Sequence, residues 1–308
     1  MNSKSVRGTL MLLLTAFIWG VAFVAQSVGM DYVGPFTFTC VRNIIGGLVL
    51  IPCIYFLDRL KKKDGSADAG KEEKKEDKKT LIVGGVCCGV ALAVASGLQQ
   101  IGVSMTTVGK AGFITALYIV IVTILGIFLK KKVGLKIWVS VAISVVGLYL
   151  LCMSGSFSMS IGDIFVLLCA IAVSIHILII DHFSPKVDCV KMSCIQFFVC
   201  GIVSIIPMFT IDPVFFHQTP SVSSILAAWV PVLYAGVLSC GVAYTLQVVA
   251  QKNTDPTVAS LVLSLESVFS VLAGWIILGQ TMSGREITGC VLMFAAIILA
   301  QLPSRKKE

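Results

Sequence analysis

Apolar stretches of about twenty residues recur along almost the whole of this 308-residue chain. A helix of about 20 apolar residues is long enough to cross the ~30 Å hydrocarbon core of a bilayer. Only 13% of the residues are charged and 57% are hydrophobic, which excludes a disordered chain and is unusual for a soluble domain. We therefore predict an all-α integral membrane protein with ten transmembrane helices, over residues 9–29, 35–57, 80–103, 108–129, 133–152, 162–182, 190–210, 226–250, 256–279 and 283–302.

The eleven cysteines do not form a pattern typical of disulfides or metal sites. All except Cys189 lie inside the apolar stretches, and none has the spacing to a second Cys or to His that zinc requires. We expect reduced cysteines that pack between helices, no metal site and no cofactor.

The net charge of +8 has a one-sided distribution. If the N-terminus is cytoplasmic, every Lys and Arg except Arg42, Lys110 and Arg285 lies before, between or after the spans on the cytoplasmic side. This asymmetry predicts cytoplasmic N- and C-termini in a multi-pass protein of the cell membrane. It also explains the basic charge without a nucleic-acid partner. Residues 58–79 are rich in both charges and form a solvated linker in this interpretation.

The two halves of the chain resemble each other. A shift of 148 residues places segment 94–126 on 242–274, with Gln99 on Gln247 and Tyr118 on Glu266. A shift of 154 residues places Arg42 on Gln196. Because each half has five spans, an odd number, the second half must enter the membrane in the opposite sense. We predict two inverted-topology repeats around a central cavity, residues 1–152 with the charged linker and residues 153–308, an arrangement typical of secondary transporters.

Glu266 lies in the middle of the ninth span, where a carboxylate costs several kcal/mol unless it faces protein or water. One interpretation is a structural hydrogen bond or an ion pair with Arg42 or Lys110. The other is contact with solute or exchange of a proton, since a buried carboxyl group can be neutral when occluded and ionised when hydrated.

Other polar and aromatic residues fall on equivalent spans, where they would line the cavity. For Arg42, pairing or extension toward the membrane interface is one interpretation and attraction of an anionic or zwitterionic group is the other. Gly85 and Gly89 in the third span have the spacing that lets two helices approach closely. The candidate substrate-binding residues are Trp19, Arg42, Gln99, Tyr118, His176, Tyr244, Gln247 and Glu266.

Four stretches carry a family resemblance: "FIWGVAFVAQ", Arg42 early in the second span, "LQQIGVSMTTVGKAGFITALY" and "LSLESVFSVLAGWIILGQTMS". In their order, spacing and duplication they resemble the two EamA domains of the drug/metabolite transporter superfamily. The resemblance covers essentially the whole chain and implies ten helices, inverted repeats, a central cavity and export of amino acids, metabolites or drugs. Where the family usually has Glu-Pro in the ninth span, this chain has Glu266-Ser267, so no proline is available to distort the helix.

These features together predict a secondary transporter that exports a small organic metabolite, such as an amino acid, by alternating access. A multidrug or toxic-compound exporter is the alternative within the same class. A non-transporting membrane sensor or assembly subunit is the alternative outside it. No nucleotide-binding or hydrolase motif is present, so we expect no enzyme activity; membrane lipid and a small solute are the expected partners, with proton coupling as one interpretation of Glu266.

Overall fold

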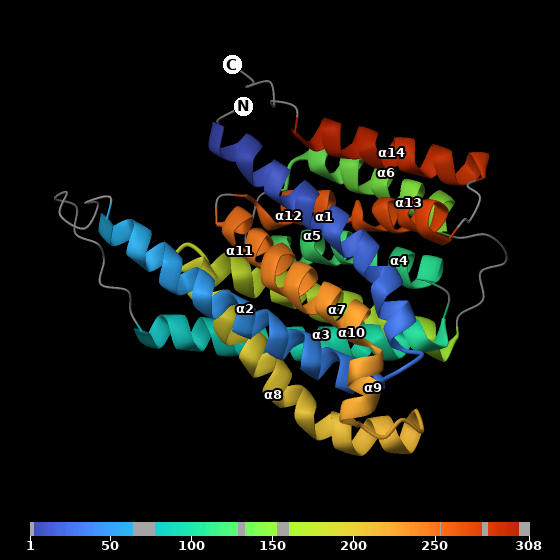
Figure 1. Ribbon diagram of the computed structural model, residues 1–308. Helices are drawn as coiled ribbons and strands as arrows, with labels where there is room; N and C mark the ends of the chain where they lie inside the picture. The colour runs from blue at the N-terminus through green and yellow to red at the C-terminus, as the bar shows by residue number, and fades with distance from the viewer. Residues whose placement is uncertain are drawn as a thin grey trace.

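The computed structural model describes residues 3–63, 78–106, 108–128, 133–152, 160–252, 254–278 and 283–301. All regular elements in these ranges are helices, which pack side by side in one bundle (Figure 1). Residues 64–77 of the predicted linker lie outside the described ranges. In chain order the helices are α1 (Ser3–Gly29), α2 (Pro35–Lys63), α3 (Lys78–Met105), α4 (Val108–Ala116), α5 (Tyr118–Phe128), α6 (Leu135–Cys152), α7 (Ile161–Phe183), α8 (Cys189–Phe215), α9 (Val222–Ala227), α10 (Trp229–Leu233), the π-helix η1 (Tyr234–Tyr244), α11 (Thr245–Gln251), α12 (Pro256–Leu263), α13 (Glu266–Leu278) and α14 (Gly284–Gln301).

Eight helical segments in the described part of the chain are long and apolar enough to cross a membrane. They correspond to the predicted spans one to four and six to nine. The predicted fifth span contains a shorter apolar helix, Leu135–Leu150. The predicted tenth span corresponds to α14, which is not among the eight segments. The chain is thus an all-helical, multi-pass membrane protein, and the count of ten spans stays a prediction.

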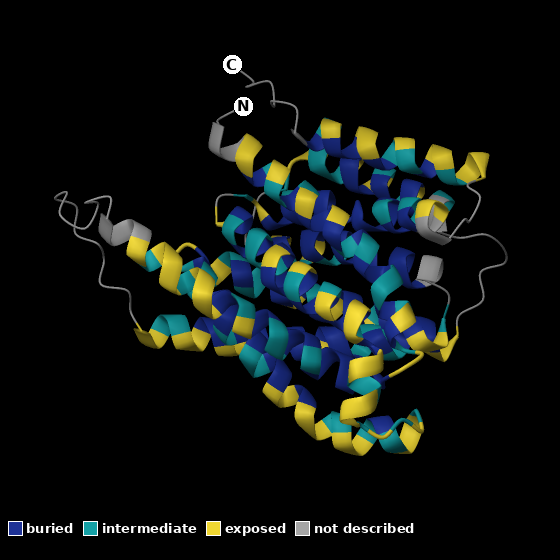
Figure 2. Cartoon of the chain, in the orientation of Figure 1, coloured by how far each residue is buried: buried dark blue, intermediate teal, exposed yellow. Residues whose placement is uncertain are grey.

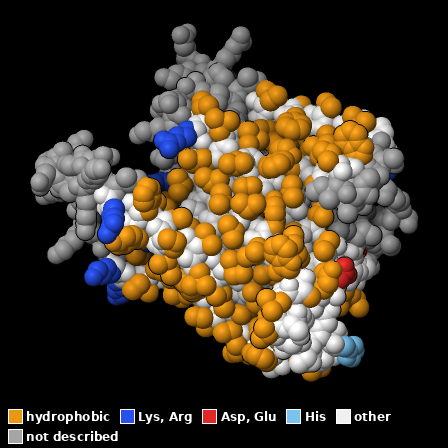
Figure 3. All heavy atoms as spheres, viewed as in Figure 1, with side chains coloured by type: hydrophobic (Ala, Val, Ile, Leu, Met, Phe, Trp, Pro, Cys, Tyr) orange, Lys and Arg blue, Asp and Glu red, His pale blue; other side chains and the backbone are white. Residues whose placement is uncertain are grey.

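Large apolar side chains cover the outside of the bundle, as expected for a surface that faces lipid (Figures 2 and 3). Phe56, Ile206 and Ile298 are examples, each more than 60% exposed. Lys and Arg side chains instead gather where helices end on one side of the molecule (Figure 3). We call this side the basic end and the other side the opposite end. The described basic residues that lie near it are Arg7, Arg59, Lys78, Lys79, Lys136, Lys186, Lys191 and Lys252.

The helices pack most extensively in a few pairs. α2 packs along α8, α6 along α14, and α3 along both α7 and α8, while α1 contacts η1, α11 and α13. Gly85 and Gly89 explain the close approach of α3 to α8. A Cβ atom at Gly85 would lie 2.5 Å from Ile195 Cγ2, and one at Gly89 would lie 2.7 Å from the Gln196 carbonyl oxygen. The predicted small-residue contact is therefore present.

A carboxylate from α8 secures the start of α2 at the opposite end. Asp212 is fully buried and accepts hydrogen bonds from the backbone N–H groups of Phe36 (3.1 Å) and Thr37 (2.7 Å) and from the Thr37 hydroxyl (2.7 Å). Helix α2 has no side-chain cap of its own there, because Gly34 occupies the preceding position. A Cβ atom at Gly34 would lie 2.3 Å from Asp212 Cγ, so the carboxylate can approach only a glycine. Asp212 satisfies N–H groups that would otherwise be orphaned.

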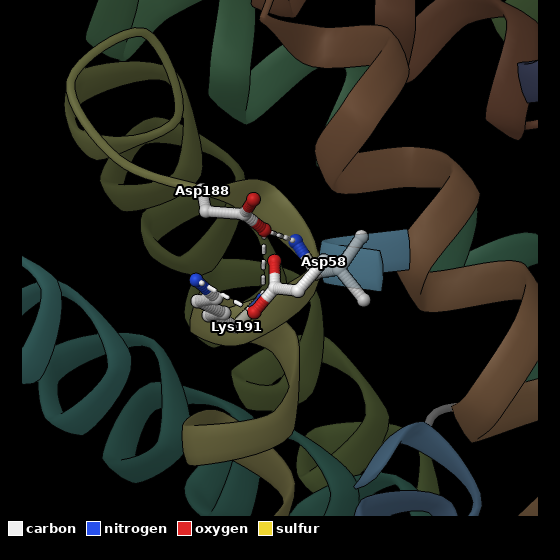
Figure 4. Close-up of polar contacts among 4 residues, drawn as sticks. Asp58, Asp188 and Lys191 are labelled. Atoms are coloured by element: carbon white, nitrogen blue, oxygen red, sulfur yellow. Dashed lines mark hydrogen bonds and ion pairs between the residues drawn. The ribbon is translucent and has the colours of Figure 1, made fainter. Parts of the chain in front are cut away.

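The basic end has a related but more exposed contact between the same two helices (Figure 4). The Asp58 carboxylate of α2 forms an ion pair with Lys191 of α8 at 3.3 Å. The backbone N–H groups of Val190 and Lys191 donate hydrogen bonds to the side chain of Asp188, which caps α8. Under the 154-residue shift, Asp58 corresponds to Asp212 and Lys191 to Thr37, so each end of the α2–α8 pair uses the equivalent carboxylate.

Replacing Asp212 by Ala should destabilise the protein much more than replacing Asp58 by Ala. The first change leaves two buried N–H groups and a hydroxyl without an acceptor, at about 1–3 kcal/mol for each unsatisfied group. The second removes an exposed pair worth about 0–1 kcal/mol. We expect a melting temperature lowered by several degrees in detergent for Asp212→Ala and nearly unchanged for Asp58→Ala. Equal melting temperatures for the two variants would show that the buried contacts do not stabilise α2.

Candidate functional site

A small cavity lies among the central helices of the bundle. Its volume is ≈ 50 Å³, enough for about three water molecules at ~15 Å³ each. Sites for organic ligands usually measure about 300–1,000 Å³, so the cavity must widen before it admits a metabolite. Its lining includes all eight candidate residues: Trp19, Arg42, Gln99, Tyr118, His176, Tyr244, Gln247 and Glu266. The structure therefore brings the eight together, and their contact with solute stays a prediction.

Two membrane spans are interrupted beside this cavity. The fourth span breaks at Leu117 between α4 and α5, and the ninth breaks at Ser264 and Leu265 between α12 and α13. At each break a leucine N–H bonds to the carbonyl three residues earlier, Leu117 to Ile114 and Leu265 to Val262, both at 3.2 Å. Tyr118 and Glu266 are the first residues of α5 and α13. The breaks thus occur at equivalent residues of the two halves.

The interruption of the ninth span needs no proline. The Ser260 and Ser264 hydroxyls donate to the carbonyl oxygens of Thr257 (2.9 Å) and Leu261 (2.7 Å), each three residues earlier. Hydroxyls that bond back to the preceding turn compete with the backbone ladder and often bend helices. The absence of the usual proline after Glu266 therefore does not prevent a helix break at this point.

The break places Glu266 at the N-terminus of a half-helix. A helix N-terminus carries a partial positive charge, which favours a carboxylate in the first turn. The residue is 5% exposed and lines the cavity, next to the Tyr118 phenol. The side chain thus faces the interior of the bundle, where its cost is lower than in lipid.

Arg42 remains inside the bundle. It is 3% exposed, lines the cavity, and its guanidinium carbon lies 5.6 Å from the centre of the Phe38 ring. This position contradicts the interpretation that the side chain extends to the membrane interface. Arg42 and Glu266 do not form an ion pair with each other or with another described residue. A structural ion pair of Glu266 with Arg42 is therefore not present. The side chain of Lys110, the other partner considered, is outside the described part of the structure.

Aromatic rings form one wall of the cavity. The Tyr244 ring lies 4.5 Å from that of Trp19, 5.9 Å from that of Phe197 and 6.0 Å from that of His176, measured between centroids. The Tyr244 and Trp19 rings are tilted by 57°, so they present a folded apolar surface. Such rings can pack against the carbon skeleton of a solute.

Tyr244 ends the π-helix η1, which interrupts the α-helical winding of the eighth span. Side chains of α1 bond to carbonyl groups of this element: Thr15 donates to Ala243 (3.1 Å) and Trp19 to Ser239 (3.4 Å). π-helical segments are frequent at functional sites because they shift side chains relative to a regular α-helix. No sequence feature noted above predicted η1.

Several polar atoms around the cavity have no protein partner. They are Gln26 Oε1, Arg42 Nε, Thr115 Oγ1 and Gln247 Oε1, whereas the Tyr118 phenol has Glu266 as its hydrogen-bond partner. Buried polar groups are nearly always hydrogen-bonded, so such a group implies water or a ligand. Four of them around one cavity indicate an interior suited to a polar occupant.

His176 has a protein partner. Its Nε2 atom lies 3.2 Å from Gln196 Oε1, and the side chain is 2% exposed. Gln196 is the residue equivalent to Arg42 in the second half, so the two halves place different groups at this position. No group of three His, Cys, Asp or Glu side chains in the described ranges could hold a metal ion.

Some polar lining residues were not among the predicted eight. Their helical spacing could have identified them, since Gln26 lies seven residues after Trp19, Ser96 three before Gln99, and Thr115 three before Tyr118. The additional polar lining residues are Gln26, Ser96, Thr115 and Ser239.

The model of the EamA-like transporter family matches residues 6–153 and again residues 160–302. The chain belongs to the EamA-like transporter family. EamA proteins are part of the drug/metabolite transporter superfamily, which confirms the family resemblance found in the sequence.

Two curated relatives are similar over nearly the whole chain. An uncharacterized transporter of Archaeoglobus fulgidus is 29% identical over 301 residues, which are 97% of this chain and 87% of the relative. Uncharacterized transporter YoaV of Bacillus subtilis is 21% identical over 299 residues, 96% of each chain. A solved crystal structure shares the fold with a TM-score of 0.74, at 18% identity and over 96% of both chains. These matches and the apolar helices show that this EamA protein is a membrane transporter.

Proposed function

We propose that this EamA transporter moves a small zwitterionic metabolite, such as an amino acid, out of the cell by alternating access. One observation carries the proposal: the central cavity holds a buried guanidinium, Arg42, and a carboxyl group, Glu266, that are not paired with each other. A zwitterion supplies one charge of each sign and would compensate both. The amide groups of Gln99 and Gln247 add hydrogen-bonding capacity, and the rings of Trp19 and Tyr244 provide the apolar wall.

Inverted repeats would give such a site access to both sides in turn. Three features support them. First, the helix packing is repeated when each helix of one half is exchanged for its counterpart in the other half. The packing of α3 on α7 then corresponds to that of η1 and α11 on α1, and the packing of α3 on α8 corresponds to that of η1 on α2. The fourth and ninth spans break at Leu117 and Leu265, 148 residues apart. The Asp212 and Asp58 contacts at the two ends of α2 and α8 are 154 residues apart.

The distribution of basic residues supports an orientation in the cell membrane. Lys and Arg side chains gather at the basic end, which also has the first described residue of α1 and the last of α14. Positively charged segments stay in the cytoplasm during insertion. We propose that the basic end and both termini are cytoplasmic, so that the opposite end faces outward.

Counterflow in vesicles reconstituted with the purified protein tests this proposal. Vesicles are loaded with an unlabelled solute, and uptake of the labelled form is measured for amino acids, for the amines that lack their carboxylate, and for hydrophobic cationic dyes. We expect counterflow of one or more amino acids and much slower counterflow of the corresponding amines. Absence of counterflow across the panel would instead favour the sensor or assembly subunit.

A multidrug exporter is the second candidate. The tilted Trp19 and Tyr244 rings favour it, because flat aromatic walls accept varied apolar cations. The buried guanidinium of Arg42 argues against it, because it would repel a cation held beside these rings. Counterflow of dyes without counterflow of amino acids would decide for the multidrug exporter.

A further inference from the structure

A second hollow lies at the opposite end of the bundle, between the C-terminal ends of α1 and α3. Its volume is ≈ 320 Å³. Its lining has four polar residues, Ser27, Asp31, Ser104 and Gln218, and five apolar ones, Met30, Val33, Pro35, Val103 and Phe216. Asp31 and Ser104 are exposed, so the hollow is open to its surroundings. We call it the vestibule.

The vestibule lies on the same helix faces as the central cavity. On α1, Trp19, Phe23 and Gln26 line the cavity and Met30 lines the vestibule. On α3, Leu92, Ser96 and Gln99 line the cavity and Val103 lines the vestibule. Both series have steps of four, three and four residues, which keep side chains on one face of a helix. The cavity and the vestibule therefore follow each other along one face of α1 and one face of α3, where Gln26 and Gln99 of the cavity are succeeded by Met30 and Val103 of the vestibule.

The loop after α8 completes the vestibule with a hydrogen-bond acceptor. His217 has φ of 53°, a left-handed conformation that is uncommon for a residue with a side chain. The turn brings Gln218 beside α1, where its side-chain amide donates to the Met30 carbonyl oxygen at 3.0 Å. Gln218 Oε1 has no protein partner. Strain at His217 thus coincides with the placement of an acceptor in the vestibule.

Charge in the vestibule has one sign. Asp31 is the acidic side chain among its lining residues, and no described lining residue is Lys or Arg. Carboxylate, amide and hydroxyl oxygens accept hydrogen bonds from an ammonium group. This chemistry favours solutes that carry an ammonium group over anions.

Two positions equivalent to vestibule residues are buried at the basic end. Shifts of 154 and 148 residues place Met30 on Ser184 and Val103 on Gln251. There the Gln251 side-chain amide donates to the Ile177 carbonyl oxygen at 3.4 Å, joining α11 to α7, and Ser184 is fully buried. Ile180, Val187 and Val248 belong to a buried apolar cluster at this end. The residues equivalent to Met30 and Val103 are therefore buried at the basic end, whereas Met30 and Val103 line a hollow at the opposite end.

We propose that the vestibule is the outer solute site of the transport route, that it selects ammonium-bearing solutes through Asp31, and that it leads to the central cavity between α1 and α3. The proposal deepens the proposed function and depends on the orientation given there. It assigns to Asp31 and Gln218 a contact with solute before the solute reaches Arg42 and Glu266.

Thiol modification in intact cells that express the full chain tests the vestibule without measuring transport. Two membrane-impermeant methanethiosulfonates are compared, one with a trimethylammonium group and one with a sulfonate. Ser27→Cys is the test variant and Val28→Cys its matched control, because Val28 is the next residue of α1 and is 40% exposed on the outside of the bundle. Labelling of the parent protein is subtracted, since it has cysteines of its own.

We expect Ser27→Cys to react at least about tenfold faster than Val28→Cys, since aqueous reagents reach a hydrated hollow but not a lipid-facing side chain. The ratio of the reaction rate of the cationic reagent to that of the anionic reagent should be about fivefold higher at Ser27→Cys than for a free thiol. A single nearby charge has an effect of this size in a hydrated site. Adding Asp31→Asn should bring this ratio close to that for a free thiol. Ser104→Cys provides a second test position if Ser27→Cys does not reach the membrane.

Three results would overturn the vestibule: equal rates for Ser27→Cys and Val28→Cys, a charge preference unchanged by Asp31→Asn, or labelling only from the basic end in inverted vesicles. The outcome is separate from that of counterflow. A protein that is inactive in counterflow but labelled as expected would contradict the transport proposal, and with it the role of the vestibule in transport, while it would confirm a hydrated hollow that attracts cations.

Discussion

Replacing Glu266 by Gln is expected to reduce the initial rate of transport at least about tenfold, or to remove its dependence on pH, with normal amounts of protein in the membrane. Gln has nearly the shape of Glu, so α13 should still begin at residue 266. What is lost is the charge and the exchangeable proton. A hydrogen bond to a charged group contributes about 1.5–3 kcal/mol, which corresponds to roughly tenfold or more in rate or affinity.

Glu286→Gln is the matched control. Like Glu266 in α13, Glu286 lies in the first turn of its helix, α14. It accepts hydrogen bonds from Ser283, which precedes that helix. It does not line the cavity. We expect transport close to that of the parent, because both variants remove a helix N-terminal carboxylate but only one removes it from the cavity.

Initial rates across pH 5.5–8.5 separate the two interpretations of Glu266. A residue that only joins helices should lower the melting temperature and scale all rates equally when changed. A residue that binds solute or exchanges a proton should change the rate or the shape of the pH profile while the melting temperature stays near that of the parent. Parent-like transport at every pH would refute the functional role of Glu266.

The membrane spans could be predicted because each apolar run carries its own signal in about twenty consecutive residues. The irregular backbone within the spans could not be predicted in this way. The break at Leu265 depends on whether the Ser260 and Ser264 hydroxyls bond back to the preceding turn, and a serine within a helix need not do so. The π-helix η1 accepts side-chain hydrogen bonds from α1, such as that from Thr15 to the Ala243 carbonyl oxygen. These contacts join residues more than two hundred positions apart.

The lining of the cavity was predictable where a strongly polar or aromatic side chain stands out against an apolar run. Glu266, Arg42 and Gln247 are of this kind, and all three line the cavity. Ser96 and Thr115 are not, because small hydroxyls often bond within their own helix and occur on any face of a span. The internal repeat gave the most useful guide, since it identified Tyr118 as the counterpart of Glu266 and both begin a half-helix beside the cavity.

Replacement of Arg42 is expected to have the second large effect on transport. Arg42→Gln should raise the concentration of zwitterionic solute that gives half-maximal transport by about tenfold to a hundredfold, with little change for the amine that lacks the carboxylate. The guanidinium cannot lose its charge and has no ion-pair partner among the described residues, so it is available to a carboxylate of the solute. Gln fits sterically in an equivalent environment, because Gln196 occupies the corresponding position of the second half.

Arg42→Lys and Arg285→Gln complete the comparison. Lys retains the charge but lacks the planar fork that binds a carboxylate with two hydrogen bonds, so its effect should be intermediate. Arg285 also lies over an aromatic ring, 5.1 Å from the centre of Tyr149, but on the exposed start of α14. Its replacement by Gln should leave transport of both solutes unchanged.

The melting temperature decides whether Arg42 acts on solute or on the fold. Removing a buried charge that has no ion-pair partner relieves a desolvation cost, so Arg42→Gln should be as stable as the parent or more stable. A residue that mainly holds α2 in place would give the reverse: a lower melting temperature and equal losses for the zwitterion and the amine. Because the second outcome would leave the guanidinium without a role in binding, it would also remove the observation on which a zwitterionic substrate rests.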